Sequence, residues 1–144
     1  MTVDEIQRRF LLAQRVLRLA TADAGGQPYL VPICFALDGD TLYTPIDEKP
    51  KQASPTGLRR LRNVAENPRV ALLADHYDDQ DWARLGYVLV FGRARVLVEG
   101  PLHAKALALL RQRYRQYQTM DLESRPVLAI AVERVSGWGD LGAT

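Results

Sequence analysis

One segment restricts the fold more than any other, because residues 29–37, YLVPICFAL, are apolar on both faces of an extended strand. The segment lies between two turn signals, DAGGQP at residues 23–28 and Asp38-Gly39-Asp40, which are typical of hairpins. A strand with two apolar faces must be covered on both sides. In a barrel the interior covers one face, and a helix, a ligand or a second subunit must cover the other.

The rest of the chain predicts a small antiparallel barrel with helices packed outside it. We expect strands over residues 15–22, 29–37, 41–46, 69–76, 87–98 and 126–135, and helices over 3–13, 56–66 and 101–117, with a loop after residue 135. Gly92 is expected to bend the long fifth strand. These elements, about six strands and three helices, form hairpins early and long crossovers late, which favours a mainly β fold with peripheral helices. A chain of 144 residues suits a single domain spanning residues 1–144.

Composition and charge exclude several classes of function. The net charge of +2 is too small to indicate nucleic-acid binding, and no apolar run approaches the roughly 20 residues of a membrane-spanning helix. One cysteine, Cys34, cannot form an internal disulfide, and the start of the chain lacks a secretory signal, so we expect a cytoplasmic protein. The two histidines, His76 and His103, offer too few ligands for a metal site, and His103 is expected to be solvated.

A cluster of five cations is the strongest sign of a binding site. It comprises Lys49, Lys51, Arg59, Arg60 and Arg62, within fourteen residues. The arginines fall in the first turns of a predicted helix, where unpaired N–H groups and the helix dipole already favour an anion. These patterns alone leave two interpretations open, a phosphate site or a solvated basic face balanced by nearby acids.

The helix is expected to bury one face and to leave its arginines outside. The expected buried residues are Leu58, Leu61 and Ala65.

The aromatic residues are expected to have two kinds of role. Tyr114 and Tyr117 are expected to pack on a helix, whereas Trp138, between two glycines in a polar tail, favours an interface or ligand role. For Trp82 the two roles are evenly balanced.

An ordered set of short motifs covers about residues 8–139, in the sequence RLATAD, YLVPICFALDGD, LYTPIDEKPK, LRRLRN, NPRVALL and a late GW. This set resembles the pyridoxamine 5'-phosphate oxidase-like split barrels that bind FMN. The match is best to the actinobacterial branch of F420-dependent oxidoreductases. The resemblance implies a six-stranded antiparallel split barrel, and a homodimer with two equivalent cofactor sites at the subunit interface.

The resemblance also implies which residues line the cofactor site. Val31, Pro32, Ile33 and Cys34 would lie beside the ring system, followed by Thr44, Pro45, Ile46 and Asp47, then by the phosphate-binding cations Lys49, Lys51, Arg59 and Arg60. Arg60 takes a place where many relatives carry a lysine, which keeps the positive charge. Trp138 would be the aromatic group that the family supplies across the dimer.

The expected activity is hydride transfer between coenzyme F420 and a small conjugated substrate. No acid–base pair, nucleophile or nucleotide-binding motif is evident in the sequence, as in proteins whose cofactor performs the chemistry. We therefore assign no catalytic residue. FMN in place of F420 is the nearest alternative, and a non-catalytic carrier of flavin, deazaflavin or haem is a second.

Overall fold

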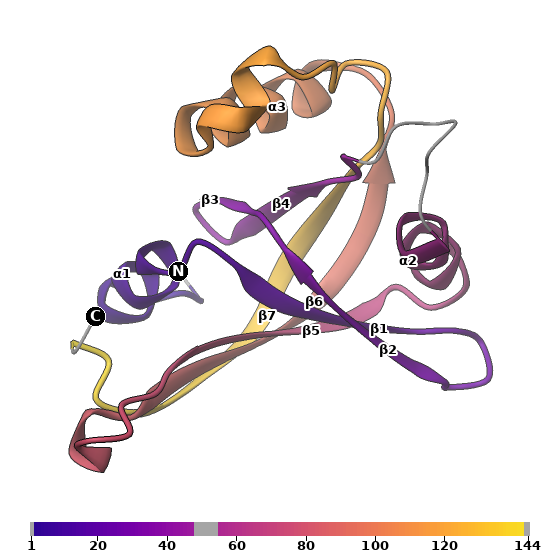
Figure 1. Cartoon of the computed structure of the whole chain (residues 1–144). Coiled ribbons are helices and arrows are strands. Elements are labelled where there is room, and N and C mark those ends of the chain that lie inside the picture. Colours follow the sequence, from indigo (N-terminus) through magenta and orange to yellow (C-terminus); the bar gives the residue numbers. More distant parts are fainter. Residues whose placement is uncertain (1, 48–54, 143–144) are drawn as a thin grey trace.

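The structure, a computed structural model, describes residues 2–47 and 55–142, with the side chains of residues 55–58 excepted. Its centre is one curled antiparallel sheet in the order β2-β1-β5-β6-β7-β4-β3 (Figure 1). The strands are β1 (Leu17–Ala22), β2 (Pro28–Ile33), β3 (Ala36–Asp38), β4 (Thr41–Pro45), β5 (Arg69–His76), β6 (Gly86–Leu97) and β7 (Val127–Gly139). The helices are α1 (Glu5–Ala13), α2 (Pro55–Glu66) and α3 (Pro101–Arg113), with short 3₁₀ turns over Trp82–Arg84 and Arg115–Thr119.

The sheet curls because consecutive strands occupy its two opposite edges. Strands β2 and β3 lie at the two ends of the strand order, yet only Cys34 and Phe35 separate them in the chain. Three peptide steps reach at most about 11 Å, so the Cα atoms of Ile33 and Ala36 cannot lie farther apart. The two edges of the sheet therefore approach each other, and the sheet forms a half-barrel.

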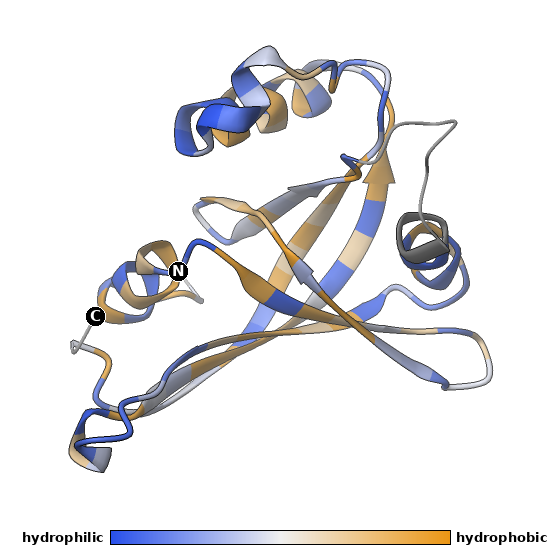
Figure 2. Ribbon diagram, in the orientation of Figure 1, coloured by the Kyte–Doolittle hydropathy of each residue, from blue (hydrophilic) through white to orange (hydrophobic). Residues whose placement is uncertain are grey.

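Two apolar clusters stabilise this arrangement. The first fills the inside of the curl with residues from all seven strands, from α1 and from α2, and it also includes Phe35; Phe10, Leu19 and Phe35 are not exposed at all. The second lies between α3 and the outer face of β4 and β7, and includes Tyr43 and Leu110. Figure 2 shows α3 turning apolar residues toward the sheet and polar residues away from it.

The mainly β prediction is confirmed, with three corrections to the elements. The strand predicted over 29–37 is two strands, because the chain crosses from one sheet edge to the other at residues 34–35, and the described sheet therefore has seven strands. The predicted loop after residue 135 is instead the end of β7, which β6 pairs as far as Gly139. The helix predicted over 101–117 ends at Arg113, and a 3₁₀ turn follows it.

A β-bulge lies opposite Gly92, in β7 rather than in β6, where the bend was predicted. The register between β6 and β7 shifts between Phe91 and Gly92, which leaves Glu133 of β7 as the extra residue. A Cβ on Gly92 would lie 2.4 Å from the carbonyl oxygen of Ala131, so only glycine permits this close approach of the two backbones.

No helix among the described residues is long and apolar enough to cross a membrane.

Candidate functional site

The free edge of β2 is the first part of the candidate site. Within the described residues β2 pairs only with β1, and its two prolines, Pro28 and Pro32, suit an edge strand because they cannot donate to a neighbouring strand. The side chains of Val31 and Ile33 are buried in the inner cluster. The strand therefore offers a ligand its main-chain groups rather than these two predicted side chains.

The β3–β4 hairpin brings the second predicted segment to the first. Ala36 lies opposite Tyr43, the residue before Thr44, and the Tyr117 side chain contacts both Cys34 and Asp47. Thr44 is only 1% exposed, and its hydroxyl has no hydrogen-bond partner among the described residues. A buried hydroxyl without a partner costs free energy, which a ligand that bonds it would recover.

Asp47 is held from two sides just beyond β4. Its carboxylate accepts a hydrogen bond from the hydroxyl of Tyr117 at 2.8 Å, and its carbonyl oxygen accepts one from Arg125. Ile46 donates its N–H to the carbonyl of Pro126 at 2.9 Å. The residues that end β4 are therefore fixed by the chain that follows α3.

The Tyr117 hydroxyl stays protonated in this setting. Burial raises the pKa of Tyr117 far above its usual value, and the neighbouring Asp47 carboxylate and Cys34 thiol raise the pKa further. A neutral hydroxyl can donate to the carboxylate over the whole range in which the carboxylate is charged. Both tyrosines after α3 pack as predicted, with ring centroids 5.4 Å apart in an edge-to-face pair.

Helix α2 is turned differently from the prediction. Arg60, expected outside, is only 4% exposed, whereas Ala65, expected to be buried, is exposed. Asn63 turns toward the sheet and donates its side-chain amide to the Thr21 hydroxyl at 3.0 Å, and Val64 packs in the inner cluster. Leu61 packs against the same cluster as predicted, and the side chain of Leu58 lies outside the described residues, so the buried face is shifted rather than reversed.

The exposed part of α2 lies beside the edge strand. Arg59 is exposed and its guanidinium lies 5.4 Å from the ring centroid of Tyr29 on β2. This cation–π contact places a positive charge next to the free edge. Lys49 and Lys51, the other predicted phosphate contacts, lie outside the described residues.

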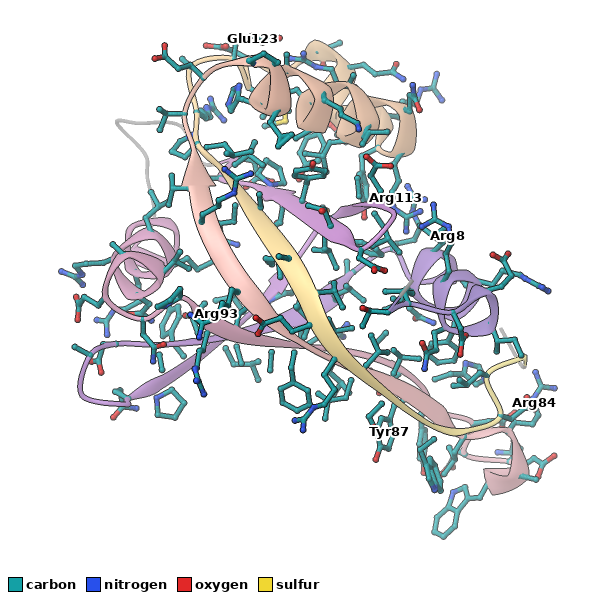
Figure 3. All side chains as sticks on the ribbon, turned by 180° about the vertical axis from the view of Figure 1, so that it is seen from behind. Arg8, Arg84, Tyr87, Arg93, Arg113 and Glu123 are labelled. Carbon is teal, nitrogen blue, oxygen red and sulfur yellow. The ribbon has the colours of Figure 1, made fainter. Side chains whose placement is uncertain are left out.

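Trp138 is not brought to this site within one chain. Thr44 pairs with Leu128, and Trp138 lies ten residues farther along β7, roughly 33 Å away at strand spacing. Trp138 is 54% exposed and stacks on Tyr87, with ring centroids 5.6 Å apart. Figure 3 shows Tyr87 at the end of the sheet remote from α3 and Glu123.

Two buried residues near the site were missed or misplaced by the sequence analysis. His103, expected to be solvated, is 4% exposed, and its Nε2 lies 2.7 Å from the carbonyl oxygen of Arg125. Arg125 was not singled out, since a lone arginine between Ser124 and Pro126 carries no motif. The described residues contain no group of three or more His, Cys, Asp or Glu side chains that suits a metal ion.

Comparison with known proteins gives one curated relative and many structural ones. The chain is 35% identical, over 91 residues, to the 5a,11a-dehydrotetracycline/5a,11a-dehydrooxytetracycline reductase of Streptomyces rimosus subsp. rimosus. That match covers 63% of this chain and only 61% of the reductase.

The solved structures share the fold. A haem-binding protein from Mycobacterium smegmatis superposes with a TM-score of 0.74 at 23% identity, over 96% of this chain and 54% of that one. A FAD-binding protein from Mesorhizobium loti gives a TM-score of 0.64 at 27% identity, over 90% of this chain and 89% of that one. The sequence model of pyridoxamine 5'-phosphate oxidase matches residues 3–139, nearly the whole chain. The curled half-barrel is thus a split barrel, and this chain belongs to the pyridoxamine 5'-phosphate oxidase family.

Proposed function

We propose that this protein is an oxidoreductase that binds coenzyme F420 along the free edge of β2 and transfers a hydride between it and a small conjugated substrate. The observation that carries the proposal is the free edge of β2, together with the unpartnered, buried hydroxyl of Thr44 on β4. The likeness to a reductase and to a FAD-binding protein supports flavin-type redox chemistry.

The residues present fit a planar cofactor with an anionic tail. The main-chain N–H and carbonyl of Leu30 and the carbonyl of Pro32 face away from β1 and can bond the polar edge of a ring system, and the Thr44 hydroxyl supplies one more hydrogen bond. Arg59 and Arg60 supply positive charge for the phosphate, and Lys49 and Lys51 are proposed to add to it. The bound cofactor supplies the hydride chemistry, and the chain binds and orients it.

The number of cations favours F420 over FMN. One phosphate is satisfied by two or three cationic groups, whereas the chain carries five between Lys49 and Arg62. F420 carries a phosphodiester and an oligoglutamate tail, so its negative charge extends along a line. Buried Arg60 is suited to a single fixed phosphate, and the exposed Arg59 and Arg62 are suited to a tail that lies on the surface.

We also propose that the protein is a homodimer whose second subunit covers the outer face of the sheet. Several large apolar residues are exposed there or on the edge strand: Leu30 at 64%, Leu73 at 36%, Tyr87 at 36% and Trp138 at 54%. A second copy would bury them and bring its own Trp138 toward the cofactor site. Obligate dimers bury more than roughly 2,000 Å². Sedimentation at low micromolar concentration that shows only a 16.2 kDa species would overturn this part of the proposal.

A carrier of haem is the second candidate, and the likeness to a haem-binding protein favours it. Haem needs an axial ligand, most often histidine. His103 is engaged by the Arg125 carbonyl, which leaves His76 as the histidine of the described residues with a buried Nε2 that has no hydrogen-bond partner. Substitution of His76 by Ala would abolish haem binding in a carrier and leave F420 binding unchanged in an oxidoreductase.

The deciding experiment measures dissociation constants for F420, FMN and haem with the purified protein at one salt concentration. F420 without its glutamates is the matched ligand control. We expect intact F420 to bind most tightly and the shortened form to lose part of that advantage. Tighter binding of FMN, or purification with stoichiometric FMN, would show that the choice of F420 is wrong.

A further inference from the structure

A buried hydrogen bond at the end of β4 is not explained by the ligand contacts proposed above. The Tyr117 hydroxyl donates to the carboxylate of Asp47 at 2.8 Å, and Tyr117 is only 4% exposed. The tyrosine is itself fixed, because its ring packs against Tyr114 and its carbonyl accepts a hydrogen bond from Arg111 at 3.0 Å. The hydroxyl is thus rigidly placed on the α3 side of Asp47.

Asp47 is the acid whose charge would matter most to an anionic cofactor. It follows Thr44–Ile46 directly, in the stretch that is proposed to contact the cofactor. The other two acids of the β3–β4 hairpin are engaged elsewhere: Asp38 pairs with Lys105 at 2.7 Å, and Asp40 accepts the N–H groups of Thr2 and Val3. A carboxylate left free beside a phosphate would repel it.

We propose that Tyr117 is a positioning residue of the cofactor site, which holds the Asp47 carboxylate on the α3 side so that its charge does not oppose the cofactor phosphate. This inference rests on the proposed function, since it requires a phosphate-bearing cofactor at this end of β4. Arg125 assists, because it holds the carbonyl of the same residue and brings a positive charge to the same side.

The experiment compares ligands that differ only in the phosphate. Dissociation constants for FMN and riboflavin, and for F420 and its phosphate-free chromophore, are measured by fluorescence for four proteins: wild type, Tyr117→Phe, Asp47→Asn and the double variant. Tyr77→Phe is the matched control, because it removes a hydroxyl that bonds Asp79 at 2.9 Å on the exposed surface. Thermal unfolding of each variant reports any loss of fold.

Repulsion between the Asp47 carboxylate and the cofactor phosphate predicts a specific pattern of affinities. Tyr117→Phe weakens the phosphate-bearing ligands about tenfold, which corresponds to about 1.4 kcal/mol, and leaves the phosphate-free ligands within about twofold. In the Asp47→Asn background Tyr117→Phe no longer has this effect: the double variant binds each phosphate-bearing ligand within about twofold of Asp47→Asn, because the repelling charge is gone. Tyr77→Phe binds all four ligands as wild type does.

Other patterns overturn the inference. A merely structural tyrosine would weaken phosphate-bearing and phosphate-free ligands alike, and its loss would not be rescued by Asp47→Asn. If the wild type binds one of the phosphate-bearing ligands while Tyr117→Phe binds it equally well, only the role of Tyr117 is refuted. If the wild type binds none of the four ligands, the proposed function fails and the role of Tyr117 fails with it.

Discussion

Substitution of Gly92 by alanine tests the packing of the two longest strands. The new Cβ would lie 2.4 Å from the carbonyl oxygen of Ala131 and 3.0 Å from Cγ2 of Ile130. Carbon and oxygen in close contact need about 3.3 Å, so β7 must move by about 0.9 Å. Overpacking typically costs 1–3 kcal/mol, and we expect about 3 kcal/mol because the obstructing atom belongs to the backbone of a paired strand.

Thermal unfolding followed by circular dichroism measures this cost. For a chain of this length about 3 kcal/mol corresponds to a decrease in Tm of roughly 10 °C. Gly25→Ala is the matched control, because its Cβ would meet only Asp23 Oδ1 at an ordinary 3.5 Å and its φ is not positive. If Gly92→Ala unfolds within about 2 °C of Gly25→Ala, the close approach of β6 and β7 at the bulge is refuted.

Three further predictions concern the site and the surface. Arg60→Ala should weaken F420 binding at least tenfold, since one charge-assisted hydrogen bond contributes about 1.5–3 kcal/mol, and it should lower Tm because Arg60 is buried. Arg59→Ala should weaken F420 binding without changing Tm, because Arg59 is exposed. Equal Tm values for the two variants would contradict the burial of Arg60. Thr44→Val should leave Tm unchanged or higher, because the buried hydroxyl has no partner, and should still weaken cofactor binding several-fold by titration. The hydrogen bond from Arg111 lowers the pKa of Glu123 from 4.5 to about 2, so the stabilisation by this pair is present above pH 4.5 and is lost as pH falls toward 2. Denaturant unfolding of Glu123→Gln between pH 2 and 6 should show a correspondingly weaker dependence on pH, and an unchanged dependence would contradict the pairing.

Much of the fold could be predicted because alternation and turn residues act locally. The hairpin at Asp38-Gly39-Asp40 was visible in the sequence, since its turn depends on a glycine with positive φ. The end of β7 was not visible. Ser136, Gly137 and Trp138 are all exposed, so no buried face produced an alternating pattern, and only pairing with β6 makes them a strand.

The site was predicted less completely because its geometry depends on contacts between distant segments. The resemblance to a family pointed to residues 31–34 and 44–47, and Tyr117 contacts one residue of each segment, Cys34 and Asp47. It gave no sign of the hydrogen bond between Tyr117 and Asp47, whose residues are 70 positions apart. The orientation of α2 was missed for a related reason, because Asn63 meets Thr21 across 42 positions.

The two-residue connection between β2 and β3 sets an upper limit on the distance between the two edges of the sheet at this point. Most separations in a protein are set by side-chain packing, and they change when a core residue is replaced or when the temperature rises. The distance between Ile33 and Ala36, one on each of these two sheet edges, is instead limited by three peptide units, whose length neither substitution nor heat alters. Substitutions around this connection can therefore change the side chains there without moving the two edges farther apart at this point than about 11 Å.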